Sequence, residues 1–205
     1  MTGRQDHWDS VYTTKAATSV SWFQPHAALS LDFIVAASPN HDRSVIDVGG
    51  GASTLIDDLL ARNYRDITVL DISRAALETA QARLGGAAER VAWVVADIAR
   101  WSPARTWDIW HDRAVFHFLT DPPQQDAYIA ALTRGTLAGA TVIMATFAPD
   151  GPEKCSGLPV QRYDPESLAR RLGAAFTLSG QARETHVTPW GSDQRFSYAV
   201  FKRAG

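Results

Sequence analysis

Short apolar runs alternate with helix-like segments from residue 44 onward, and this alternation constrains the fold more than any other feature. The first cycle combines a buried strand at 44–48, a glycine-rich turn and an amphipathic helical pattern at 54–63. Further strand-like runs follow at 66–73, 91–98, 106–116 and 140–148, and helical patterns at 74–85, 126–139 and 165–173. Strands that alternate with helices need right-handed crossovers, which predicts a doubly wound, mostly parallel α/β sheet.

The end of the chain departs from this rhythm. Polar and apolar residues alternate at 175–187 and again at 194–203, with a short turn between the two runs. Such a pattern predicts an antiparallel hairpin added to the edge of the sheet. The length of 205 residues suits one domain. We divide it into an N-terminal segment (1–43), a ligand-binding core (44–150), and a final part with a loop, a helix and the hairpin (151–205).

Composition excludes several classes of protein. The 20 Lys and Arg nearly balance the 22 Asp and Glu, so no net field favours nucleic acid or an anionic membrane. No apolar run approaches the roughly 18 residues of a membrane helix, and the N-terminus lacks the apolar core of a signal peptide. One cysteine allows no internal disulfide, and no Cys/His cluster has metal-ligand spacing. We expect a cytoplasmic protein without a metal, a nucleic-acid partner or a membrane partner.

Aspartates end three successive strands, and the first precedes a glycine loop. The stretch "VIDVGGGAST" places Gly49, Gly50 and Gly51 after Asp47, where glycine lets the backbone bend sharply and approach a ligand. A dinucleotide fingerprint would need glycine where Thr54 stands, which weakens the case for NAD and leaves another nucleoside.

The second and third acids fit the same kind of ligand. Asp71 follows Asp47 at close to the roughly 20-residue spacing at which an acid meets ribose hydroxyls. Asp97 ends the third strand, where a carboxylate can accept a hydrogen bond from an exocyclic amine, and Ile72 and Ile98 can sandwich a purine. Each acid alone could be a solvated turn residue, but three in successive cycles predict a nucleoside site.

The motifs "DVGGG", "LDIS" and "ADI" resemble, in order, the cofactor motifs of class I S-adenosylmethionine-dependent methyltransferases. The resemblance covers residues 44 to about 147, and the hairpin matches that family's antiparallel final strand, so it implies a seven-stranded, Rossmann-like sheet. It also implies S-adenosylmethionine as cofactor. By resemblance, the glycine loop and first acid meet the methionine moiety, the second acid meets ribose, and the third site meets adenine. The residues concerned are Asp47, Gly49, Gly50, Gly51, Asp71, Ile72, Asp97 and Ile98.

Aromatic residues gather in the polar stretch from residue 7 to residue 25: Trp8, Tyr12, Trp22 and Phe23. They could simply pack a helix and a loop onto the core. Alternatively, they form a lid, because aromatic rings stabilise a sulfonium cation by roughly 0.5 to 2 kcal/mol and a closed site excludes water. The segment is similar to those that close the cofactor pocket in thiopurine-type and small seven-strand lysine methyltransferases. We therefore predict that Trp22 and Phe23 contact the cofactor.

The stretch "WDIWHDRAVFHFL" brings three ionisable groups, His111, Asp112 and Arg113, to the end of an apolar strand. Such groups are costly to bury unless they are paired or face a cleft. We predict that they lie beside the transferred methyl group, with His111 or Asp112 as base where the acceptor arrives protonated. His111 could instead have a structural role, and Asp112 and Arg113 could form a buried ion pair. His117 is expected to be a packed helix residue.

Two further residues are candidates for the acceptor side. Cys155 lies in a loop bounded by glycine and proline, where a reactive or acceptor-contacting thiol would suit the site, although a lone cysteine is usually inert. Trp190, with His186, is placed at the rim of the pocket or in a simple hairpin turn.

The predicted function is methyl transfer to a small-molecule acceptor, with a thiol or another soft nucleophile favoured. Methylation of a protein lysine is the first alternative, although His111, Asp112, Arg113 and the alanine after them depart from the Asp-Lys-Gly-Thr element of that branch. A non-catalytic nucleoside-binding module is the second. An NAD(P)-dependent reductase is disfavoured by Thr54 and by the lack of a Tyr-x-x-x-Lys pattern. No heptad pattern indicates an oligomer.

Overall fold

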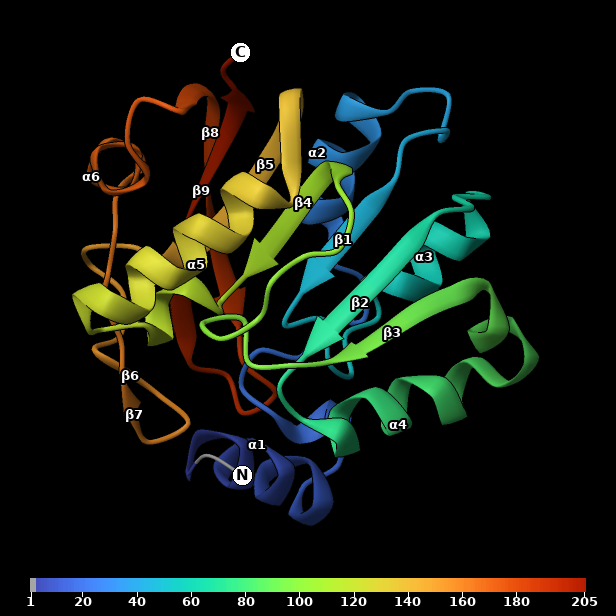
Figure 1. Ribbon diagram of the computed structural model, residues 1–205. Coiled ribbons are helices and arrows are strands. Elements are labelled where there is room, and N and C mark those ends of the chain that lie inside the picture. The colour runs from blue at the N-terminus through green and yellow to red at the C-terminus, as the bar shows by residue number, and fades with distance from the viewer. Residues whose placement is uncertain (1–2) are drawn as a thin grey trace.

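The computed structural model describes residues 3–205 and contains one seven-stranded sheet with helices on both faces (Figure 1). The order of its strands is β3-β2-β1-β4-β5-β9-β8. The sheet strands are β1 (Val45–Val48), β2 (Ile67–Asp71), β3 (Val91–Val95), β4 (Trp107–Arg113), β5 (Thr136–Phe147), β8 (Phe176–Val187) and β9 (Asp193–Arg203). A separate two-stranded hairpin consists of β6 (Lys154–Cys155) and β7 (Leu158–Pro159).

Six α-helices lie in the described part of the chain: α1 (Gly3–Thr14), α2 (Ala28–Ala37), α3 (Leu55–Ala61), α4 (Arg74–Leu84), α5 (Pro122–Arg134) and α6 (Pro165–Leu172). Short 3-10 turns are η1 (Ala17–Ser19), η2 (Gly85–Arg90) and η3 (Phe116–Phe118). The sheet is parallel from β3 to β5, while β9 is antiparallel to β5 and β8. Both the doubly wound α/β fold and the C-terminal hairpin are thus confirmed.

The order of strands reverses direction between β1 and β4. The chain moves outward from β1 through β2 to β3, then returns to place β4 on the other side of β1. At such a switch point the loops after adjacent strands turn away from each other and leave a crevice. The glycine loop follows β1 at this point.

Alternation along the strands divides the apolar core between two faces. Val45, Ile109 and Ile143 belong to a cluster that includes residues of α2 and α3. Their chain neighbours Ile46 and Trp110 belong to a second cluster, formed with residues of α5 and α6. Successive side chains of a strand point to opposite faces, so a run of consecutive apolar residues serves both layers.

The helix predicted to end near residue 139 ends earlier, and that boundary was wrong. α5 ends at Arg134, and β5 already begins at Thr136. Gly135 lies between them and packs so closely on the ring of Trp110 that a Cβ atom there would be 2.6 Å from Cζ3. This contact between distant residues, rather than local helix propensity, sets the end of the helix.

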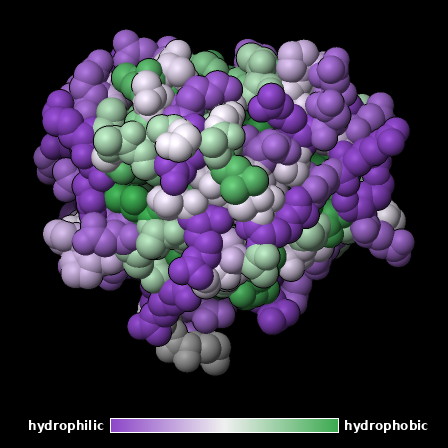
Figure 2. Space-filling model, turned by 45° about the horizontal axis from the view of Figure 1, so that its top comes forward, coloured by the Kyte–Doolittle hydropathy of each residue, from purple (hydrophilic) through white to green (hydrophobic). Residues whose placement is uncertain are grey.

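On the face shown in Figure 2, hydrophobic residues are interspersed with hydrophilic ones rather than gathered in one broad patch. Within residues 3–205, none of the helices combines the length and the apolar character that crossing a membrane requires. Helix α1 and the C-terminus lie on opposite sides of the molecule, with α1 on the side to which the parallel strands point (Figure 1).

Candidate active site

The glycine loop fits tightly between β1 and the segment after β4. Gly49 has a φ of 72°, and a Cβ atom there would lie 1.9 Å from a methyl carbon of Val115. Its N–H donates to the carbonyl of Leu70 at 2.6 Å. Only glycine tolerates both this positive φ and the close contact with Val115, so the loop is a tightly packed turn.

A cavity lies over the carboxyl ends of β1, β2 and β3, and we call it the inner cavity. Its empty space is about 800 Å³, part of it open to solvent. Five predicted cofactor residues from three cycles of the sheet line it together: Gly49, Asp71, Ile72, Asp97 and Ile98. Trp22 and Arg113 also line this cavity.

The remaining predicted cofactor residues lie beside it. Asp47, Gly50 and Phe23 line a smaller adjoining space, which we call the glycine-loop cavity. Gly51 lines neither cavity, and a Cβ atom there would be 2.8 Å from Oδ2 of Asp71 and 3.3 Å from the hydroxyl of Tyr12. The role of Gly51 is therefore to let Asp71 and Tyr12 approach the loop.

Asp71 is a buried carboxyl at the edge of the inner cavity. It is 7% exposed, and its Oδ1 accepts a hydrogen bond from the N–H of Ser73 at 2.7 Å. Burial, together with the nearby carboxylates of Asp47 and Asp9, raises the pKa of Asp71 to about 7. A ligand that donates hydroxyl hydrogen bonds and carries positive charge would stabilise the ionised form. A nucleoside sulfonium such as S-adenosylmethionine has both properties, so the residues present fit it.

Aromatic side chains line one side of the inner cavity, and a lid over the cofactor stays a prediction. We call Trp8, Tyr12, Trp22 and Phe118 the aromatic lid. Trp8 lies edge-on to Trp22 at 5.6 Å and to Phe118 at 5.1 Å between ring centroids. The indole N–H of Trp22 donates to the Tyr12 hydroxyl at 3.2 Å. These four rings, from three segments, thus contact one another in series along the inner cavity.

Helix α1, which carries part of the lid, is anchored to α4. Oδ1 of Asp9 accepts hydrogen bonds from the hydroxyl of Ser73 at 2.7 Å and from the N–H of Ala75 at 3.3 Å. A carboxylate at a helix N-terminus is favoured by both the free N–H groups and the helix dipole. The anchor holds α1 across the carboxyl edge of the sheet (Figure 1).

His111 supports the glycine loop and does not line the inner cavity. It is 2% exposed, its Nδ1 lies 2.7 Å from Oδ1 of Asp47, and its Nε2 lies 2.9 Å from the hydroxyl of Ser30. The register of the parallel pair causes this contact, because Asp47 of β1 is paired with His111 of β4. His111 borders the glycine-loop cavity and holds the first acid of the site.

Asp112 and Arg113 do not form the expected ion pair, and that prediction was wrong. The Asp112 carboxylate is fully buried, where it accepts from the N–H of Val115 at 2.9 Å and from the hydroxyl of Tyr128 at 2.5 Å. Burial raises its pKa to about 6. Because Asp112 points away from the cavity, it organises the turn after β4 and is not placed for chemistry on an acceptor.

Arg113 projects from the opposite face of β4, as the next residue of a strand must. Its guanidinium pairs with Glu184 at 3.3 Å and lies 4.3 Å from the centroid of the Phe196 ring. It also donates to the hydroxyl of Tyr198 at 3.2 Å. This cation is therefore held at the wall of the inner cavity.

Cys155 is buried, which argues against a reactive thiol, while its contact with an acceptor stays a prediction. It is 5% exposed, and burial raises its pKa to about 11, which keeps the thiol neutral. It nevertheless lines the inner cavity. Trp190 is 62% exposed in the turn between β8 and β9. His186, near the end of β8, lies 2.7 Å from the carbonyl oxygen of Ser21. His117 is fully buried in η3, a 3-10 turn, and burial lowers its pKa to about 3.

Sequence reasoning missed several residues that line the inner cavity: Arg4, Phe118, Gln194 and Phe196. Gln194 and Phe196 reach it because β9 inserts between β5 and β8. Phe118 lies in "FHFL", directly after His117. An aromatic residue close to the end of a core strand was the one signal available for it.

Comparison with known proteins agrees with this site. Residues 45–136 match the sequence model of a family described as a methyltransferase domain. That range includes the glycine loop and all three acids. A search of curated proteins found no match.

Solved structures resemble the whole chain. A SAM-dependent methyltransferase from Anabaena variabilis has a TM-score of 0.76 at 14% identity, with 99% of this chain and 96% of that chain covered. A structure described as converting a disulfide bond into a thioacetal group during echinomycin biosynthesis has a TM-score of 0.73 at 18% identity, covering 98% and 93%. A Burkholderia thailandensis 1,6-didemethyltoxoflavin N1-methyltransferase, bound to 1,6-didemethyltoxoflavin and S-adenosylhomocysteine, has a TM-score of 0.71 at 17% identity, covering 98% and 84%.

The matched domain and the fold together point to one class of protein: residues 45–136 match a methyltransferase domain, and the chain has the Rossmann-like fold of solved SAM-dependent methyltransferases. One of these structures holds S-adenosylhomocysteine. The predicted fold is confirmed, and the predicted class and cofactor agree with these findings.

Proposed function

We propose that the protein transfers the methyl group of S-adenosylmethionine to a small-molecule acceptor that is nucleophilic without help from a base. Asp71 would hold the ribose, Asp97 and Ile98 the adenine, and the glycine loop with Asp47 the methionine end. When bound, the cofactor supplies a methyl carbon on a sulfonium. The acceptor's electron pair forms the new bond, and the pair of the broken bond stays on sulfur.

The acceptor-side wall of the inner cavity is the observation that carries this proposal. Beyond the residues assigned to the cofactor, it contains Arg113, Phe118, Cys155, Gln194 and Phe196. Arg113 is a paired cation, the thiol of Cys155 is neutral, and the others do not titrate. Among the described residues, this wall therefore presents no general base.

A wall without a base selects the acceptor by its own reactivity. Thiolates, selenolates, arsenite and ring nitrogens are nucleophilic near neutral pH, whereas a lysine must first lose a proton. The paired guanidinium of Arg113 would also favour an acceptor with negative charge. Two of the similar structures concern small molecules, one through sulfur chemistry and one through a ring nitrogen, which supports the same class.

The chain's own contribution is alignment and exclusion of water. The aromatic lid covers the cavity, and holding two reactants in attack geometry lowers a barrier by several kcal/mol. Rings around a sulfonium stabilise it by roughly 0.5 to 2 kcal/mol. These effects require no proton transfer by the protein.

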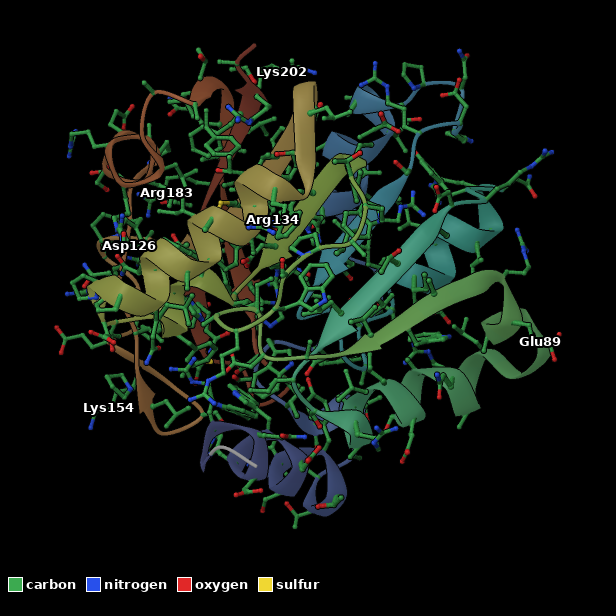
Figure 3. The ribbon with its side chains drawn as sticks, in the orientation of Figure 1. Glu89, Asp126, Arg134, Lys154, Arg183 and Lys202 are labelled. Atoms are coloured by element: carbon green, nitrogen blue, oxygen red, sulfur yellow. The ribbon has the colours of Figure 1, made fainter. Side chains whose placement is uncertain are left out.

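Two measurements test the proposal. Calorimetric titration with S-adenosylmethionine and S-adenosylhomocysteine should show binding that Asp71→Ala weakens. The matched control is Asp126→Ala, because Asp126 is an exposed carboxylate at the far end of α5 (Figure 3). If neither compound binds at millimolar concentration, the proposal fails.

A labelled-methyl screen then identifies the acceptor class. Thiols, selenite, arsenite, ring nitrogens and a lysine-rich protein extract are incubated with labelled donor. Label in the small molecules supports the proposal, whereas label in protein lysine supports the alternative. If the cofactor binds and every acceptor stays unlabelled, the protein is a nucleoside-binding module.

A further inference from the structure

A second cavity lies outside the lid, and we call it the outer cavity. It is bounded by α1, by the β6–β7 hairpin and by the turn between β8 and β9. Trp22, Cys155 and Gln194 line both this cavity and the inner one, so the two cavities adjoin at these three side chains. A molecule in the outer cavity that lies against Gln194 is therefore next to the inner cavity.

Gln194, where the two cavities adjoin, has a buried polar atom without a partner among the described residues. It is 7% exposed, and its side-chain Oε1 is buried without a hydrogen-bond partner among residues 3–205. A buried amide oxygen of this kind is destabilising unless a donor reaches it. His7, from α1, lines the outer cavity too, and its Nε2 likewise has no partner in the described part of the chain. Two unrelated elements thus offer unpaired polar atoms at one cavity.

The charge of the outer cavity favours an anionic ligand. Lys15 and Lys154 line it, and Figure 3 places Lys154 on the β6–β7 hairpin beside α1. No carboxylate is among the described residues that line it, although the whole chain has a formal net charge of −2. Positive charge at a mouth attracts anions and repels ammonium groups. The exposed ring of Trp190 adds a flat apolar surface to the same lining.

We propose that the outer cavity is the acceptor site, and that it takes a small planar molecule with a carboxylate or a similar anionic group. An N–H or O–H of this molecule, next to its nucleophilic atom, donates to Oε1 of Gln194. The anionic group lies between Lys15 and Lys154. This inference rests on the proposed function and names its acceptor by charge, shape and hydrogen bonding. It also explains why a protein lysine, a cation, suits the site poorly.

Binding of simple probes to protein saturated with S-adenosylhomocysteine tests the inference. The probes are para-hydroxybenzoate, para-hydroxybenzamide and para-hydroxybenzylamine, which share one ring and differ in charge. We expect the anion to bind about tenfold more tightly than the cation in ligand-observed NMR titrations. The double variant Lys15→Glu, Lys154→Glu should remove or reverse this order. The control Arg65→Glu, Arg90→Glu changes net charge equally at exposed positions away from the cavity and should keep it.

Gln194 is tested by a second pair of probes. Para-hydroxybenzoate can donate to Oε1 of Gln194, and para-methoxybenzoate cannot. The wild-type protein should prefer the hydroxyl compound about tenfold, and Gln194→Leu should lose this preference while still binding S-adenosylhomocysteine.

The outcomes separate the two levels of the proposal. If S-adenosylhomocysteine does not bind at all, the proposed function fails, and this inference fails with it. If it binds but the probes do not, or bind without regard to charge and hydroxyl group, the inference alone fails. Tighter binding of a lysine-rich peptide than of para-hydroxybenzoate would also overturn it.

Discussion

Replacing Asp71 by asparagine should stabilise the ligand-free protein and weaken cofactor binding. Asparagine keeps an oxygen that can accept the hydrogen bond from the N–H of Ser73, but it cannot ionise. The aspartate must either hold a proton or bear a buried charge. The substitution therefore removes the free-energy cost of ionising a buried carboxyl group. It also removes the carboxylate that is proposed to bind the cofactor.

The size of the effect follows from the pKa of Asp71. That pKa is about 7 in the folded protein, against about 3.9 in an unfolded chain. The folded state thus binds the proton more tightly, and the stability from the neutral carboxyl is complete below about pH 4 and is lost as the pH rises through about 7. The difference of about three pKa units corresponds to about 4 kcal/mol of unfolding free energy, lost in full once the pH is above about 7. At about pH 5 the loss of unfolding free energy is about 1.5 kcal/mol.

Thermal unfolding followed by tryptophan fluorescence measures this effect. The variant's advantage in Tm should grow between about pH 5 and about pH 8, reaching about 8–16 °C at the higher pH for a chain of this size. Asp126→Asn, an exposed control, should show no such growth. In calorimetry at about pH 8, Asp71→Asn should weaken S-adenosylmethionine binding by about tenfold or more. An advantage in Tm that is equal at both pH values, or a less stable variant at the higher pH, would refute the reasoning.

Three other predictions concern neighbouring residues. His111→Ala should weaken S-adenosylmethionine binding by about tenfold, because it removes the 2.7 Å contact that holds Asp47; unchanged affinity in calorimetry would show that this contact has no role. Cys155 should react with iodoacetamide about 100-fold more slowly in the folded protein than in denaturant, because its thiol is buried and neutral; comparable rates by mass spectrometry would contradict this. Gly49→Ala should lower Tm and abolish cofactor binding, because its Cβ would collide with Val115; a normally stable variant that still binds would argue against a tightly packed turn.

The strands and the acids that end them could be predicted from sequence, because both depend on local information. Apolar runs define β1, β2 and β3, and parallel strands bring their carboxyl ends to one edge of the sheet. The end of α5 could not be predicted in this way. It depends on the contact of Gly135 with Trp110, residues that only the folded chain brings together.

The candidate site was predictable on its cofactor side and much less so on its acceptor side. Alternation along β4 alone would have separated Asp112 from Arg113, because neighbouring residues of a strand face opposite ways. The partner of His111 depends on the register between β1 and β4, which the sequence does not specify. Gln194 and Phe196 reach the cavity only because the last strand inserts beside β5.

The anchoring of α1 by Asp9 affects how the cofactor would enter and leave the site. A helix tied down across the mouth of the site narrows the path to the cavity, so donor and spent product would pass more freely if α1 lifted. If the lifted form were about one molecule in a hundred, the apparent affinity would be about 100-fold below that of the open site. Loosening this tie would increase the rates of loading and of release together. Turnover in such a protein is then governed as much by how often it opens as by how fast a methyl group moves.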